Sequence, residues 1–237
     1  MAKKVLVILI FAVFAATGAF AQDFQTMPKN TITYDAGPTF VGFTFNSMES
    51  AIQEDGITGR GLGLAFQYER QLSEYLSLAG RFAYLAIDVN YTDTSQGINI
   101  GLDMNLTSFS LEGHVRFYPS GDAFFLDGMM GYTNFSSDFS GRARVNFFSQ
   151  PINLNASGNY LKLGAKIGWR INFGRPGGFT FEPAFGYYHG IALGKSVGQQ
   201  FADELGGDAD IKDAFDMIEQ FMFVGGPRLS LGFGWRF

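Results

Sequence analysis

The chain contains no cysteine, few charged residues and only two histidines. The absence of cysteine excludes disulfides, thiolate metal sites and a cysteine nucleophile. Only 16% of the residues are charged and the net charge is −5, so the basic surface that a nucleic-acid partner requires is missing. We therefore expect no cofactor, no metal site and no nucleic-acid partner.

The N-terminus has the three parts of a secretory signal peptide. Lys3 and Lys4 precede a short apolar run, and Ala19 and Ala21 form a small-x-small cleavage site. A membrane-anchoring helix is the weaker alternative, because the run is shorter than the roughly 20 residues that span a bilayer. The expected parts are residues 1–21, a cleaved signal peptide; 22–30, a short N-terminal extension; and 31–237, the exported domain.

Glycine and aromatic residues are abundant: the chain has 31 Gly, 27 Phe and 10 Tyr. So much glycine disfavours a helical bundle, since a glycine inside a helix costs up to about 1 kcal/mol relative to alanine. No second apolar run of spanning length follows the signal peptide. The exported part is therefore either a soluble β-protein or a membrane barrel.

Strict alternation of apolar and polar residues predicts strands. The clearest example is 161–173, in which every second residue is apolar, with Lys162, Lys166 and Arg170 among the residues between. A helix would align these three charges in one stripe and bury two glycines. The expected strands lie at 32–45, 62–68, 76–84, 98–117, 124–132, 161–173, 179–187 and 229–237.

Three features of this pattern are irregular. The apolar positions change phase near Thr107, which indicates a β-bulge within 98–117. Pro183 lacks the N–H that a strand of a closed barrel needs, and a local bulge would accommodate it. The phase of the first strand, 32–45, is not fixed by its residues.

Three observations favour a barrel over a soluble sandwich. The polar faces are rich in glycine and hold isolated charges, as in a narrow lumen. The connections alternate in length and aromatic residues gather near strand ends, as in outer-membrane barrels. The short connections are 70–75, 118–123 and 174–178, and the long ones are 46–58, 136–157 and 191–221. We expect a transmembrane antiparallel up-and-down β-barrel of eight strands, or ten if 136–157 holds an extra hairpin. Both termini would be periplasmic and the long loops extracellular.

Alternation also predicts which charged side chains face the lumen. Charges in a narrow, poorly hydrated lumen should form pairs. The expected lumen network consists of Glu69, Arg81, Glu112, His114, Arg116, Asp127, Lys162, Lys166, Arg170, Glu182, Arg228 and Arg236. A structural network that closes the barrel is the favoured interpretation, and a selectivity lining is the alternative.

The last long loop contains an amphipathic pattern over 208–223, with Ile211, Phe215 and Ile218 at helical spacing opposite acidic residues. The segment 203–221 could cap the barrel mouth, lie at the membrane interface or bind a partner. Its acidic face makes the interface the least favoured of the three.

The C-terminus resembles the signal that the barrel-assembly machinery recognises in outer-membrane proteins. That signal has a terminal aromatic residue preceded by hydrophobic residues at every second position, and here it comprises Leu229, Leu231, Phe233, Trp235 and Phe237. In strand number and length, residues 31–237 are similar to the small barrels of the OmpA, OmpX and OmpW type. The resemblance implies a location in the bacterial outer membrane.

The residues contain no convincing catalytic set. Lipid A deacylase barrels place a serine two residues after their histidine, but His189 is followed there by Ile191. His114 is better explained by a polar lumen network. We therefore expect no enzyme, and predict a structural or surface-interaction role in adhesion or envelope integrity. The alternative is a narrow OmpW-like channel for small, apolar solutes. Expected partners are outer-membrane lipid, the assembly machinery through the C-terminal strand, and an extracellular ligand at the loops.

Overall fold

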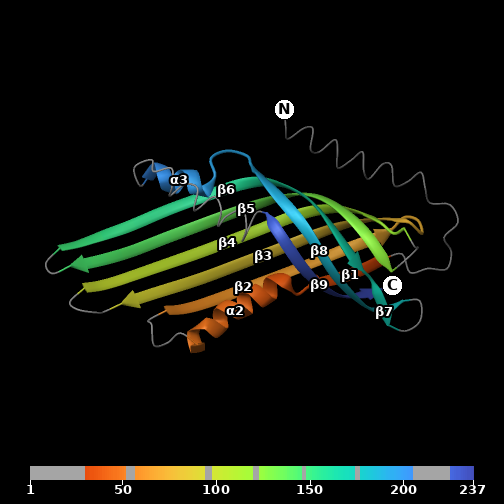
Figure 1. The fold of residues 1–237 in the computed structure, drawn as a ribbon, viewed down its shortest axis with the longest axis horizontal. Helices are drawn as coiled ribbons and strands as arrows, with labels where there is room; N and C mark the ends of the chain where they lie inside the picture. Colours follow the sequence, from red (N-terminus) through yellow and green to blue (C-terminus); the bar gives the residue numbers. More distant parts are fainter. Residues whose placement is uncertain are drawn as a thin grey trace.

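A computed structural model gives the fold (Figure 1) and describes residues 30–51, 57–93, 98–119, 123–145, 148–173, 177–204 and 225–237. In chain order the elements are β1 (Asn30–Asp35), α2 (Gly37–Ala51), β2 (Ile57–Gln71), β3 (Leu76–Asp93), β4 (Ile98–Phe117), β5 (Phe124–Val145), β6 (Phe148–Trp169), β7 (Ile171–Phe173), β8 (Gly178–Ala192), α3 (Val197–Glu204) and β9 (Gly226–Arg236). Within these described ranges, no helix is long and apolar enough to cross a membrane.

The strands form one closed antiparallel sheet. Its order is β6-β5-β4-β3-β2-β1-β9-β8-β7, and an additional pairing of β6 with β8 closes the circle. Strands β6 and β7 pair with β8 in the same register, so β7 is the continuation of β6. The barrel therefore has eight strands around its circumference. The eight-stranded prediction is confirmed. Ten strands are excluded because residues in 136–157 extend β5 and β6 instead of adding a hairpin.

The break between β6 and β7 lies opposite Pro183. Pairing with β8 stops at Gly168, which faces Ala184, and resumes at Ile171, which faces Phe181. Proline has no N–H for the ladder, so the sheet loses pairing at this point. The register on both sides of the break is unchanged, and the expected bulge at Pro183 is absent.

Strand β4 has no bulge near Thr107 either. It pairs with β3 and β5 in an unbroken register along its whole length. What changes is the face that carries the apolar residues: Leu111 and Val115 point outward, whereas Leu106 is buried inside. The change of phase in the sequence therefore marks an inversion of polarity, not an extra residue.

The barrel wall is uneven in height. One end of the barrel, here called the terminal side, holds the start of the first strand and the end of the last one. There the Asn30 N–H donates to the Phe237 carbonyl (3.0 Å). On the other, distal side, β3–β6 extend well beyond β1, β8 and β9 (Figure 1). The region 136–157, expected as a long loop, is mostly strand. Its outward residues are polar. The pattern of apolar outward residues, which identifies a membrane strand in the sequence, is therefore missing there.

The predicted first strand, 32–45, is only partly a strand. β1 ends at Asp35 and helix α2 follows. The Asp35 carboxylate accepts a hydrogen bond from the N–H of Gly37, the first residue of the helix (3.0 Å), and so satisfies one of the free amide groups of the first turn. Pro38 then occupies the first turn, where its missing N–H costs nothing. Aromatic residues at Phe40 and Phe43 made this segment look like a strand.

Two helices cover the free edges of the tall wall. β1 pairs with β2 only as far as Tyr34, and β8 pairs with β6 only as far as Ala192. On β2, the Asn46 amide of α2 accepts from the Gly61 N–H (2.9 Å) and donates to its carbonyl (3.0 Å). Gln200 of α3 covers the other edge, that of β6, in the same way.

Gln200 bonds the exposed edge of β6 through the backbone of Ser157. The Ser157 N–H donates to Gln200 Oε1 (3.3 Å), and Gln200 Nε2 donates to the Ser157 carbonyl (2.7 Å). Each amide side chain thus replaces one residue of a missing strand. Unpaired strand edges invite association with other chains, and such covering prevents it.

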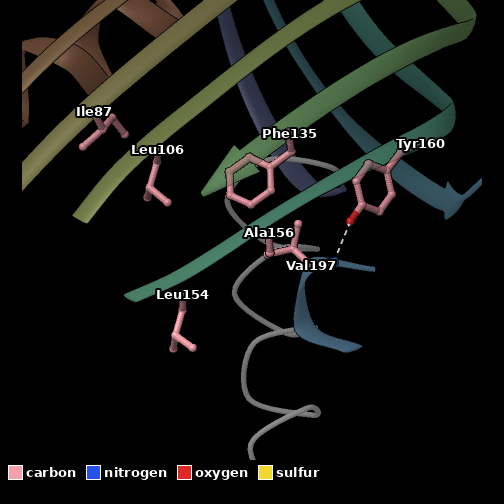
Figure 2. Close-up of a cluster of buried hydrophobic side chains, with 7 residues drawn as sticks. All are labelled: Ile87, Leu106, Phe135, Leu154, Ala156, Tyr160 and Val197. Carbon is pink, nitrogen blue, oxygen red and sulfur yellow. Dashed lines mark hydrogen bonds between the residues drawn. The ribbon is translucent and has the colours of Figure 1, made fainter. Parts of the chain in front are cut away.

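The inside of the distal half is apolar. Figure 2 shows the buried cluster, to which α3 contributes Val197; Phe45 of α2 packs against it. The wall residues of the cluster are Ile87, Leu106, Phe135, Leu154, Ala156 and Tyr160. The Tyr160 hydroxyl accepts a hydrogen bond from the Val197 N–H (3.1 Å), which fixes the start of α3. The predicted amphipathic helix at 208–223 lies outside the described residues.

Candidate functional site

The charged side chains of the terminal half meet inside the barrel. Eleven of the twelve predicted lumen residues are buried, and Arg228 is partly exposed. Ten of the twelve take part in ion pairs with one another. Alternation along each strand explains this convergence, because every second side chain points into the same narrow lumen.

Arg116 of β4 is the centre of the network. Its Nε donates to Asp127 (2.8 Å), and its Nη1 lies 2.5 Å from Glu69 and 2.9 Å from Glu182. These three carboxylates come from three strands, β5, β2 and β8. The guanidinium carbon also lies 4.5 Å from the ring centroid of Phe125. One side chain therefore ties together opposite walls of the barrel.

Arg170 is the second bridge across the lumen. Its Nε donates to Glu182 (2.6 Å) and its Nη2 to Glu69 (2.7 Å). The Tyr118 hydroxyl donates to the other oxygen of Glu69 (2.7 Å), and the Tyr118 ring lies below the guanidinium. Glu69 thus accepts from two arginines and a tyrosine. Arg170 and Glu182, two of the predicted lumen residues, thus form an ion pair inside the barrel.

A neighbouring group of ion pairs surrounds Glu112. Arg81 donates to Glu112 (2.8 Å) and to Asp35 (2.9 Å), while Lys162 lies 3.3 Å from Glu112. Asp35 was missing from the sequence-based network because the phase of the first strand was unknown. The alternation of Thr31 and Thr33 with outward residues would have predicted its position.

His114 connects the two groups of charges. Its Nδ1 lies 3.0 Å from Asp127 and its Nε2 lies 3.4 Å from Glu112. Lys166 approaches Asp127 from another strand (3.3 Å). The histidine side chain is buried among these charges.

Two predicted members lie at the ends of the network. Arg228 packs over the Tyr188 ring (5.2 Å), which also faces Lys162 (5.7 Å), at the boundary with the apolar cluster. Arg236 donates to Gln71 near the terminal rim. The network thus has a centre of carboxylate–cation pairs and cations at both ends.

Glycine creates the space for these side chains. A Cβ on Gly131 would lie 2.8 Å from the Glu112 side chain, and one on Gly164 would lie 2.5 Å from Tyr188. A Cβ on Gly186 would lie 2.5 Å from the Lys166 side chain. The lumen is therefore filled by large charged side chains that face bare backbone, and glycine-rich inner positions are a requirement of the network.

The outside of the terminal half is an apolar belt. Exposed aromatic and aliphatic residues surround it on every strand, among them Phe66, Phe82, Leu111, Leu126, Leu163, Ile167, Trp169, Phe185, Phe233 and Trp235. All five residues of the C-terminal signal are exposed on the outer face of β9. His189 is exposed on the outside as well, away from the lumen charges. Across the described ranges, no three potential metal ligands lie together.

An apolar outside and a charged inside define a transmembrane β-barrel of the bacterial outer membrane. A family model described as the autotransporter beta-domain matches residues 40–192. The chain belongs to this family. No curated protein matches the chain in sequence.

Several solved structures of outer-membrane proteins are similar to this chain. Ail, the attachment invasion locus protein of Yersinia pestis, is 12% identical with a TM-score of 0.42, over 90% of this chain and 100% of that one. CarO of Acinetobacter baumannii is 14% identical with a TM-score of 0.39, over 91% and 100%. LpxR from Salmonella typhimurium is 8% identical with a TM-score of 0.21, over 88% and 100%.

Proposed function

We propose that this protein is a closed, non-enzymatic outer-membrane barrel with a structural or surface-interaction role. The observation that carries the proposal is the ion-pair network that fills the terminal half of the lumen. Its five carboxylates, Asp35, Glu69, Glu112, Asp127 and Glu182, are matched by Arg81, Arg116, Lys162, Lys166 and Arg170.

Such a network opposes conduction. An ion entering the lumen would have to displace paired charges, and separating one buried pair costs about 3–5 kcal/mol because the remaining charge is left without a partner. An eight-stranded interior is just wide enough for side chains to fill. A closed lumen moves the function to the outer surface and the distal rim.

Export and orientation complete the proposal. Cleavage after Ala21 would release a barrel whose C-terminal strand presents its apolar signal outward, in reach of the assembly machinery. Asn30 and Phe237 are paired at the terminal side, where every connection between strands is short, whereas the distal side also holds the two long connections that contain α2 and α3. Short periplasmic turns are typical of outer-membrane barrels, so the terminal side is proposed to face the periplasm and the tall wall the outside.

Single-channel recording in a planar bilayer tests closure. The wild-type barrel is expected to give no stable conductance. The double variant Glu69→Ala/Arg116→Ala removes the centre of the network and should give measurable current. Asp138→Ala, which removes an exposed carboxylate from the outer face, is the matched control and should stay silent. A stable open state of the wild type would refute the proposal.

A second candidate is a path for small apolar solutes. Two observations favour it. The interior of the distal half is apolar. Beside it, the strand between β2 and β9 ends early, and helix α2 takes its place in the wall. Uptake of naphthalene by cells that express the protein tests this path. Faster uptake by the wild type, lost in Phe135→Asp, would support it; equal uptake with and without the barrel would reject it.

A further inference from the structure

Where its side chains are described, the outer surface of β3–β6 in the distal half carries short polar side chains. They are here called the polar face, and most of them are exposed. The polar face consists of Asp88, Asn90, Asp103, Asn105, Thr107, Asn134, Ser136, Asp138, Ser140, Asn153, Asn155, Ser157 and Asn159. These outward positions include no lysine, glutamate, aromatic or aliphatic residue.

Strand pairing arranges the polar face in straight rows. Across β3 to β6, one row is Asp88, Asn105, Asp138 and Asn155, and the next is Asn90, Asp103, Ser140 and Asn153. Hydrogen bonds fix the side chains: Asn134 Nδ2 donates to Asn159 Oδ1 (3.0 Å). In the amide orientation that satisfies both groups, Asn155 Nδ2 donates to Asp138 Oδ1 (3.1 Å). Donors and acceptors thus form an ordered array.

This composition is unfavourable for a strand that faces only water. Asn and Asp are depleted in strands, where β-branched and aromatic residues are enriched. Short side chains, however, lose less rotamer freedom on binding than lysine or glutamate side chains do. An array of this kind is suited to hydrogen-bonding a polar partner at low entropic cost.

The position of the polar face indicates which partner it meets. On β3 to β6, the next outward aromatic or leucine residues toward the terminal side are Tyr84, Phe109, Tyr132 and Leu161, which belong to the apolar belt. Since the belt contacts acyl chains, the polar face begins at the membrane surface, where lipid head groups lie. The partner is therefore continuous with the lipid that already surrounds the barrel.

Charge selects among head groups. The ionised groups of the polar face are Asp88, Asp103 and Asp138, all carboxylates that repel phosphate. The exposed Arg60 of the neighbouring strand β2 lies opposite Asp88, at the edge of the face. Neutral hydroxyl groups instead match both the carboxylates and the amides. We infer that the polar face of β3–β6 binds the saccharide portion of an outer-leaflet glycolipid through sugar hydroxyls. The inference rests on the proposed surface role and orientation, and it names the partner of that surface.

Thermal unfolding in lipid nanodiscs tests the inference. The full mature protein is placed in phospholipid alone, in phospholipid with lipopolysaccharide that carries core sugars, and in phospholipid with lipid A that lacks them. A ligand that binds only the folded state raises the Tm. We expect the Tm to rise with the core sugars and to rise much less with lipid A.

The double variant Asn105→Thr/Asn155→Thr should lose at least half of the rise that depends on core sugars. Threonine is favoured in strands, so the Tm in phospholipid alone should be unchanged or higher, which shows that folding is intact. Asn172→Thr, on β7 at the terminal rim, is the matched control and should retain the full rise.

Three outcomes would overturn the inference: no rise with core sugars, an equal rise with lipid A, or an undiminished rise in the double variant. Removal of divalent cations by EDTA should leave the rise in place, because a loss would mean that cation-bridged phosphates are the contact. An open channel in bilayer recordings, with sugar dependence intact, would reject the proposed closure and leave this inference standing.

Discussion

The two halves of the barrel carry their polar residues on opposite faces. In the terminal half, Arg116 and Glu69 lie inside and Trp169 lies outside; in the distal half, Leu106 lies inside and Asn105 outside. The strands run through both halves in one register. Backbone geometry is therefore not the cause of the difference. The surroundings of the barrel change from lipid to water and head groups, and the outward side chains change from apolar to polar with them.

The first way to break this comparison is to remove a carboxylate from each half. Glu69→Ala leaves Arg116, Arg170 and Tyr118 without their shared acceptor, and should lower the free energy of unfolding by about 3–5 kcal/mol. Asp138→Ala removes an exposed carboxylate and should change it by less than about 0.5 kcal/mol. Urea unfolding in detergent measures both. Equal losses would show that the inner charges are not a buried network.

The second way is to place a charge on the outside of each half of one strand. Leu163→Arg lies in the apolar belt of β6 and should cost about 2–4 kcal/mol in a bilayer. Asn155→Arg lies on the polar face of the same strand and should be close to neutral. Equilibrium unfolding from liposomes gives the two values. A large cost at Asn155 would move the membrane boundary beyond the polar face.

A double-mutant cycle sharpens the account of the terminal half. Arg170→Ala and Glu182→Ala should each be strongly destabilising, whereas the pair together should cost less than the sum by about 1–3 kcal/mol. The stabilities of the four proteins in detergent define the coupling energy. Strict additivity would mean that the 2.6 Å contact between these side chains contributes nothing to stability.

The smallest expected effect concerns the free edges of the tall wall. Asn46→Ala and Gln200→Ala each remove two hydrogen bonds to a strand edge and should cost about 1 kcal/mol. Gln199→Ala is the matched control: the Gln199 side chain donates to the exposed Asp203 carboxylate, and its backbone N–H, which alanine retains, donates to the Ser196 hydroxyl. Hydrogen exchange at the Gly61 and Ser157 amides should accelerate in the respective variants. Unchanged exchange would show that the amides do not seal the edges.

Much of the terminal half could be predicted from sequence. Alternation in 161–173 and 229–237 identified the outward faces, and the same parity placed Arg116, Arg170 and Glu182 inside, because lipid outside enforces apolar residues at every second position. Asp35 escaped this reasoning because β1 has only six residues and the apolar residues of the following helix do not continue its alternation, so the phase of the strand could not be fixed.

The distal half was harder to predict for a physical reason. Beyond the lipid, polar residues point outward and apolar ones inward, so the parity that identifies a membrane strand reverses. This reversal made β4 look bulged at Thr107 and made 136–157 look like a loop. The helical start at Gly37 was signalled by Asp35 and Pro38, but the aromatic residues of α2 are equally typical of strands.

Spin-label accessibility along β6 tests the central claim most directly. The chain has no cysteine of its own, so single cysteines at Asn155, Asn159, Leu163 and Ile167 carry unique labels. In liposomes, we predict that labels at Leu163 and Ile167 are accessible to oxygen dissolved in lipid, and that labels at Asn155 and Asn159 are accessible to a water-soluble nickel chelate. Lipid accessibility that continues through Asn155, or that is absent at Ile167, would contradict the inversion of polarity and the membrane position of the barrel.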